Sequence, residues 1–196
     1  MTDPSVEIVA SRLLGLANLL FALLAMATLA GILTVAMTLQ YANGELPCPL
    51  CLLQRVAMFG VCFGIMLEFR HGASSRGIGC SLVFAILLLI VSIRQTLLDI
   101  YPRPGHEYIG SAVLGLHMPV WSIIIALALL IAYAARLALL GGGDPRSYVL
   151  ADFSRLQKIA NLLSLYVVAL CLINLVSVIL QCGLGQCHTF GYELLQ

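Results

Sequence analysis

The stretch PCPLCLLQRVAMFGV, residues 47–61, joins a pair of cysteines to an arginine and to the start of a long apolar run. Pro49 suits the first turn of a helix, because the N–H that proline lacks has no helical partner at that position. Cys48 and Cys51 therefore stand where a helix begins. Arg55 follows one turn later, on the same face as Cys51. The stretch predicts an apolar helix that opens on a Cys-x-x-Cys pair and carries a cation.

The composition indicates a membrane protein. Of the 196 residues, 61% are hydrophobic and only 10% are charged, too few to cover the surface of a soluble domain of this length. Backbone polar groups must be paired inside lipid, so each run long enough to span it should be helical. The fold class predicted is an all-α polytopic membrane helix bundle, one domain over residues 1–196, with transmembrane helices near 13–39, 51–69, 78–99, 119–140 and 160–181.

The lysines and arginines predict how the helices are oriented, because such residues gather on the cytoplasmic side. Only Arg103 lies in a loop on the opposite side, and Arg55 and Arg94 lie inside predicted helices. The N-terminus is therefore expected in the cytoplasm and the tail, residues 182–196, outside, which in a bacterium is the periplasm. Seven cations define the cytoplasmic side: Arg12, Arg70, Arg76, Arg136, Arg146, Arg155 and Lys158.

The first apolar run resembles a secretory signal peptide in part, but it is longer than the apolar core of such a peptide. We expect it to be retained as the first transmembrane helix. The net charge of +1 and the lack of a basic cluster give no indication of nucleic-acid binding.

Four of the seven cysteines fall on the predicted exterior side, a compartment in which disulfides form. Cys48 and Cys51 at a helix start are typical of a redox centre, because the positive helix end favours a thiolate. The alternative is a structural disulfide, with Arg55 extending its head group to water. Cys182 and Cys187 form the second pair. The remaining three fall inside helices or near the cytoplasmic end and are interpreted as small apolar residues without a chemical role: Cys62, Cys80 and Cys171.

The second pair lies in QCGLGQCH, residues 181–188, where two glycines make the segment flexible. Flexibility suits a dithiol that must reach both a partner protein and the first pair; the alternative is a small disulfide loop that ties down the tail. The spacing of Cys182, Cys187 and His188 fits no zinc pattern, so no metal site is predicted. Exterior histidines leave metal binding open as an alternative: His106, His117 and His188.

Three stretches together resemble the bacterial disulfide bond formation protein B (DsbB) family. Residues 47–61 are similar to the start of that family's second helix. QTLLDIYPRPG, residues 95–105, is similar to the end of its third helix and the loop after it. LGLHMPVWSI, residues 114–123, is similar to the start of its fourth helix. The resemblance implies a DsbB-like four-helix core, to which this chain adds a fifth transmembrane helix.

The resemblance also implies an activity. Members of the family are inner-membrane enzymes that reoxidise a periplasmic thioredoxin-fold dithiol oxidase (DsbA-like) and pass the electrons to a membrane quinone, ubiquinone or menaquinone. By this resemblance Cys51 is the thiolate that touches the quinone, and Arg55 supports the quinone head group. Cys48 exchanges disulfides with the second cysteine pair.

The chain departs from the family pattern in two places. The family carries its second cysteine pair between the third and fourth helices, whereas residues 100–118 contain no cysteine. We hypothesise that Cys182 and Cys187 have taken over this shuttle role. Gln95 stands where a histidine is common near the quinone. Arg94 either compensates for that histidine or extends outward to water, so both residues are candidate quinone contacts.

Two other functions fit the same residues. One is a membrane thiol reductase or quinone reductase that resembles the vitamin K epoxide reductase proteins, which also join a Cys-x-x-Cys to a quinone in a helix bundle. The order of motifs fits that group less well. The other is a non-catalytic membrane protein, either a metal carrier or an assembly subunit, whose function would not depend on the cysteines.

Overall fold

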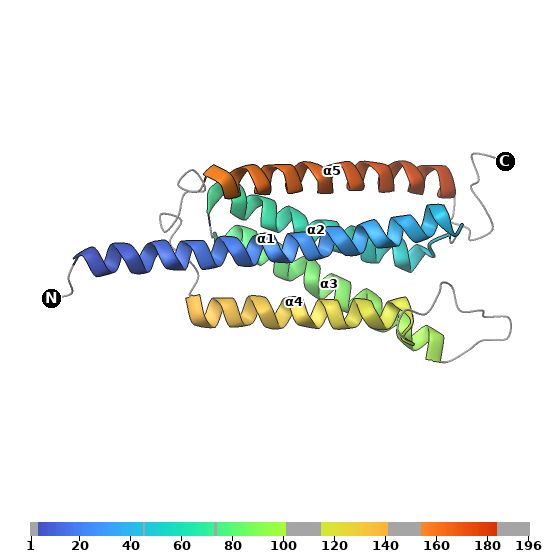
Figure 1. The fold of residues 1–196 in the computed structure, drawn as a ribbon. Coiled ribbons are helices and arrows are strands. Elements are labelled where there is room, and N and C mark those ends of the chain that lie inside the picture. The colour runs from blue at the N-terminus through green and yellow to red at the C-terminus, as the bar shows by residue number, and fades with distance from the viewer. Residues whose placement is uncertain (1–3, 45, 73, 101–114, 141–153, 184–196) are drawn as a thin grey trace.

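The computed structural model describes residues 4–44, 46–72, 74–100, 115–140 and 154–183. Over these ranges the chain forms five α-helices and no strand. All five are long and apolar enough to cross a membrane, which confirms the predicted all-α membrane bundle. The helices are α1 (Pro4–Ala42), α2 (Pro49–His71), α3 (Ser75–Ile100), α4 (Met118–Leu140) and α5 (Ser154–Cys182), as shown in Figure 1.

Each predicted span lies inside one observed helix, but two helices begin well before their spans. α1 begins at Pro4 and α5 begins at Ser154. The first turns of α5 carry Arg155 and Lys158, both exposed. Hydropathy marks only the part of a helix that suits lipid, so it does not detect helical turns that continue into the polar zone.

Successive helices run in opposite directions (Figure 1). The end of α1, the start of α2, the end of α3, the start of α4 and the end of α5 therefore share one end of the bundle. Alternating spans require this grouping, and because their number is odd, α1 starts at one end of the bundle and α5 finishes at the other. Which end faces the cell exterior stays a prediction, and most of the tail, including Cys187, lies outside the described residues.

The helix α2 is the centre of the bundle. It packs against α1, α3 and α5, and α3 packs in turn against α4. More than half of the apolar span of α2 is buried, against about a fifth for α4 and α5. The outward faces of the other helices carry large apolar side chains, such as Leu24, Ile131 and Leu165, which suits contact with lipid.

Small residues bring α2 and α3 into close contact. A Cβ atom added at Gly64 would lie 2.6 Å from the backbone nitrogen of Ser81 on α3. A Cβ atom added at Gly77 would lie 2.6 Å from Cγ of Glu68 on α2. Since helices in lipid associate through tight packing rather than through the hydrophobic effect, these glycines set how closely the two backbones approach.

A buried ion pair joins three helices near the far end of α2. Nη2 of Arg136 on α4 lies 2.5 Å from Oε2 of Glu68, and neither side chain is exposed beyond 2%. Nε of Arg136 donates to Oδ1 of Asn18 on α1 at 2.7 Å, and the guanidinium stacks on the rings of Phe21 and Tyr133. A charge buried in a membrane bundle needs a partner, so the pair ties α4 to α1 and α2.

We predict that Gly64→Ala destabilises the bundle by about 1–3 kcal/mol, because its methyl group would force the α2 and α3 backbones apart. Thermal unfolding of the purified protein in detergent measures the effect. Gly79→Ala is the matched control, since nothing lies within 4 Å of a Cβ atom there. The control should be neutral or gain up to about 1 kcal/mol from helix propensity. Equal effects of the two variants would contradict close packing at Gly64.

Candidate functional site

The cysteine pair at the start of α2 is a disulfide, Cys48–Cys51. Cys48 is the N-cap residue of α2, with an extended backbone at φ −70° and ψ 161°, and Pro49 takes the first turn as predicted. Sγ of Cys48 accepts the free N–H of Cys51 at 3.1 Å, as an N-cap side chain does. The helix start therefore favours negative charge on Cys48 as well as on Cys51.

The two cysteines differ in burial, since Cys48 is buried and Cys51 is only half-buried. Leu53 and Val56, which follow on α2, are exposed on the surface that suits lipid. A membrane-soluble reagent would therefore reach Cys51 more easily than Cys48.

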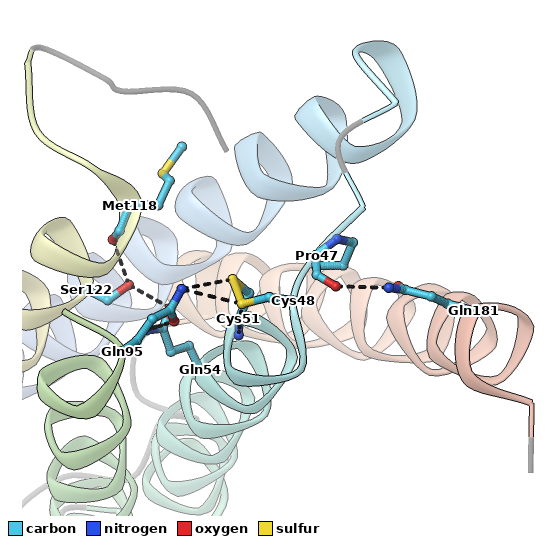
Figure 2. The surroundings of a disulfide bond; sticks show 8 residues. All are labelled: Pro47, Cys48, Cys51, Gln54, Gln95, Met118, Ser122 and Gln181. Atoms are coloured by element: carbon cyan, nitrogen blue, oxygen red, sulfur yellow. Dashed lines mark hydrogen bonds between the residues drawn. A yellow bond between two sulfur atoms is a disulfide. The ribbon is translucent and has the colours of Figure 1, made fainter. Parts of the chain in front are cut away.

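Gln95 of α3 faces both sulfur atoms of the pair. Its side-chain Nε2 donates to Sγ of Cys51 at 3.3 Å and to Sγ of Cys48 at 3.4 Å, as Figure 2 shows. Gln95 is buried, whereas the neighbouring Arg94 is exposed. The structure thus brings Gln95 to the disulfide and turns Arg94 outward. A contact of either residue with a quinone stays a prediction.

Two further polar residues stand behind Gln95. Gln54 of α2 donates to Oε1 of Gln95 at 3.0 Å, and Ser122 of α4 donates to Oε1 of Gln54 at 3.2 Å (Figure 2). Both residues lie inside stretches that carry the family resemblance, 47–61 and 114–123, but the sequence assigns neither of them a role. The signal available was weak: single polar residues inside otherwise apolar helices, which need partners in lipid.

Arg55 is buried, with 8% of its surface exposed. Its guanidinium donates to Oε1 of Gln40 at 2.6 Å and to the carbonyl of Ala36 at 3.1 Å, both on α1. It also donates to Oδ1 of Asn174 on α5, at 3.2 Å. The alternative in which Arg55 extends its head group to water is therefore wrong. Its contact with a quinone stays a prediction.

Three buried polar residues one or two turns apart, Asn174, Ser177 and Gln181, form what we call the polar seam of α5. Asn174 accepts from Arg55, and Ser177 hydrogen-bonds the hydroxyl of Tyr41. In the sequence, only the regular spacing of these polar residues within the last apolar run indicates that α5 makes polar contacts with other helices. The seam holds α5 against α1 and α2.

The last contact of the seam brings α5 to the cysteine pair. Nε2 of Gln181 donates to the carbonyl of Pro47 at 2.9 Å (Figure 2). These two residues directly precede Cys182 and Cys48 in the chain, and both cysteines are buried. Cys182 is itself disulfide-bonded. One hydrogen bond between α5 and the segment before α2 thus joins the residues that directly precede two disulfide-bonded cysteines.

The other described cysteines are free: Cys62 is buried, Cys80 is half-buried and Cys171 is exposed. Among the described residues, no three histidine, cysteine or acidic side chains gather closely enough to hold a metal ion.

Comparison with known proteins gives a consistent family. A model of the family "Disulfide bond formation protein DsbB" matches residues 18–136, from within α1 to the last turns of α4. Disulfide bond formation protein B of Aromatoleum aromaticum is 34% identical over 80 residues, 39% of this chain and 48% of that protein. The protein of the same name from Chromohalobacter salexigens is 30% identical over 125 residues, 58% and 70% of the two chains.

The chain thus spans about half the length of several curated relatives that it matches. No solved structure matches it. α5 and the polar seam lie beyond the region that the family model covers.

We predict that Arg55→Lys lowers the stability of the protein by about 1–3 kcal/mol, because one ammonium group cannot serve three acceptors on two helices with the geometry of a guanidinium. Thermal unfolding in detergent measures the change. Arg70→Lys is the matched control, since Arg70 is an exposed arginine on the same helix and its replacement should cost less than about 0.5 kcal/mol. Equal stability of the two variants would contradict this role of Arg55.

Proposed function

Because the chain belongs to the disulfide bond formation protein DsbB family, we propose that it is a multi-pass inner-membrane oxidoreductase that generates disulfides. In this proposal it reoxidises a periplasmic thioredoxin-fold dithiol oxidase and passes the electrons to membrane quinone. The N-terminus lies in the cytoplasm and the C-terminus in the periplasm. Family membership and the five membrane-length helices support the general assignment.

The observation that carries the proposal is the hydrogen bond between Gln181 and Pro47. It holds the residue before Cys182 against the residue before Cys48, so that two disulfide-bonded cysteines share one end of the bundle. A redox pathway with two disulfides in series needs this proximity, because each exchange requires direct attack of one sulfur on another. The contact therefore supports the tail pair, Cys182 and Cys187, as the shuttle.

The proposed reaction consists of two successive thiol–disulfide exchanges. A thiolate of the reduced partner attacks the disulfide of the tail pair, and the second partner thiol completes the exchange, so the partner leaves oxidised and the tail pair becomes a dithiol. A tail thiolate then attacks Cys48 and displaces Cys51 as a thiolate. The second tail thiol attacks in turn, which restores the tail disulfide and leaves Cys48 and Cys51 reduced.

The residues beside Cys51 fit a quinone. The amide of Gln95 carries two N–H donors at the sulfur pair. A carbonyl oxygen of a quinone can accept a hydrogen bond from such a donor. Cys51 is the less buried cysteine, next to side chains that face lipid. Cys51 and Gln95 would hold the quinone, with Arg55 and Arg94 as further predicted contacts. When bound, the quinone supplies an acceptor for the two electrons of the reduced pair.

We predict that the purified protein reduces ubiquinone or menaquinone when a reduced thioredoxin-fold dithiol protein is added, as followed by quinone absorbance. Cys182→Ser should abolish turnover, because the tail then has no disulfide to receive the partner's electrons. Cys171→Ser is the matched control on the same helix, since Cys171 is free and exposed.

Turnover that survives in Cys182→Ser would retain the oxidase and refute the tail shuttle. If neither quinone is reduced with any dithiol partner, the oxidase proposal itself is wrong, and the reductase or non-catalytic functions replace it.

We also predict that Cys51→Ser traps a disulfide between Cys48 and a tail cysteine, because Cys48 then lacks its usual partner and lies beside the anchored end of α5. Peptide mass mapping without reductant detects the cross-link. Gln181→Leu in the same background should lower its yield, since the hydrogen bond to Pro47 is lost. A free Cys48 thiol in Cys51→Ser after oxidation would contradict the proposed proximity.

A further inference from the structure

A chain of three buried amide and hydroxyl groups ends on the Cys48–Cys51 disulfide, and the exchange described above leaves two of its members without a role. The chain runs from Ser122 on α4, through Gln54 on α2, to Gln95 on α3 (Figure 2). Each of the three residues is only 6% exposed. Burying uncharged polar groups among apolar helices is costly unless they pair, so their alignment requires an explanation.

The direction of the hydrogen bonds is set at the sulfur end. Disulfide and thiolate sulfurs only accept, so Gln95 must present its NH2 group to them and keep its Oε1 turned away. That oxygen accepts from Nε2 of Gln54 at 3.0 Å, which leaves Oε1 of Gln54 to accept in turn from Ser122 at 3.2 Å. Every donor in the chain therefore points toward the disulfide.

A rotation of the Gln95 amide by half a turn would reverse this order. Its carbonyl oxygen would then face the sulfurs, and its NH2 group would face the NH2 group of Gln54. Gln54 opposes that rotation as long as its own Oε1 accepts from Ser122. The hydroxyl of Ser122 has a second acceptor within 3.2 Å, the carbonyl of Met118, so its contribution is the weakest of the three.

We propose that Ser122 and Gln54 are positioning residues that hold the Gln95 amide in the donor orientation toward Cys48 and Cys51. The amide binds a neutral disulfide weakly and a thiolate strongly, because hydrogen bonds to charged acceptors are stronger. We call the hydrogen-bonded series Ser122, Gln54 and Gln95 the relay. The relay thus stabilises the reduced pair relative to the oxidised pair and makes the disulfide a better oxidant. This inference rests on the proposed function and deepens it by identifying what tunes the disulfide that passes electrons to the quinone.

The test is the reduction potential of the Cys48–Cys51 pair, measured without quinone or partner protein. The full-length protein carries Cys182→Ser and Cys187→Ser, so that one disulfide remains. It is equilibrated in detergent with mixtures of reduced and oxidised dithiothreitol, in which two electrons pass from one dithiol to the protein disulfide. Alkylation of the free thiols and mass spectrometry give the reduced fraction.

Gln95→Met and Gln54→Met should each shift the equilibrium about tenfold toward the disulfide, which lowers the potential by about 30 mV. Ser122→Ala should shift it less, in the same direction, and Ser122→Thr should restore the parent value because it keeps the hydroxyl. Ser92→Ala is the matched control. Ser92 is also a buried serine, one turn from Gln95 on α3, but its hydroxyl donates to Leu88 of its own helix.

A parent-like potential in folded Gln54→Met would overturn the relay, even if Gln95→Met shifts, because Gln95 would then act alone. A shift in Ser92→Ala equal to that in Ser122→Ala would also overturn it. If Gln54→Met does not fold, the comparison of Ser122→Ala with Ser122→Thr decides in its place. Failure of quinone turnover would not affect these potentials, so the relay and the proposed function fail separately.

Discussion

A polar side chain inside a lipid-embedded bundle has no water to turn to, so it must find its partners on neighbouring helices. The arrangement around α2 follows from this constraint. Near its start, Arg55 is satisfied by α1 and α5. Near its end, Glu68 is satisfied by Arg136 of α4. Lipid offers little hydrophobic gain for helix association, so these two polar contacts, with the glycine packing of α3, decide which helices surround the disulfide.

Much of the fold could be predicted from the sequence, because length and apolarity alone mark a membrane helix. The helix start at Cys48 was also predictable, since Pro49 fixes where a helix can begin. The neighbours of each helix were not predictable. Arg136 was counted among the cytoplasmic charges, but the structure buries it against Glu68. A charge near the end of an apolar run is compatible with both positions.

The candidate site divides in the same way. The two cysteines and Gln95 were identifiable because they belong to motifs with a known spacing. Gln54 and Ser122 lie inside two of the stretches that resemble the family, but no role for them could be predicted, because their contacts depend on the way three helices converge on the sulfurs. Arg55 allowed two directions on the sequence alone, and only the positions of Gln40 and Asn174 decide between them. A helical period tells which face a residue occupies but not which helix covers that face.

The anchoring of α5 by Gln181 has a thermodynamic consequence. A cysteine at the tip of a long loop loses conformational freedom each time it approaches its target, and this entropy enters the barrier of every encounter. Cys182 instead stands at the end of α5, directly after Gln181, which is hydrogen-bonded to the residue before Cys48. The ordering entropy of this stretch is lost once, when the bundle assembles. In the proposed exchange, the effective concentration of Cys182 at the first pair is therefore set by the geometry of the bundle and not by the length of a flexible loop.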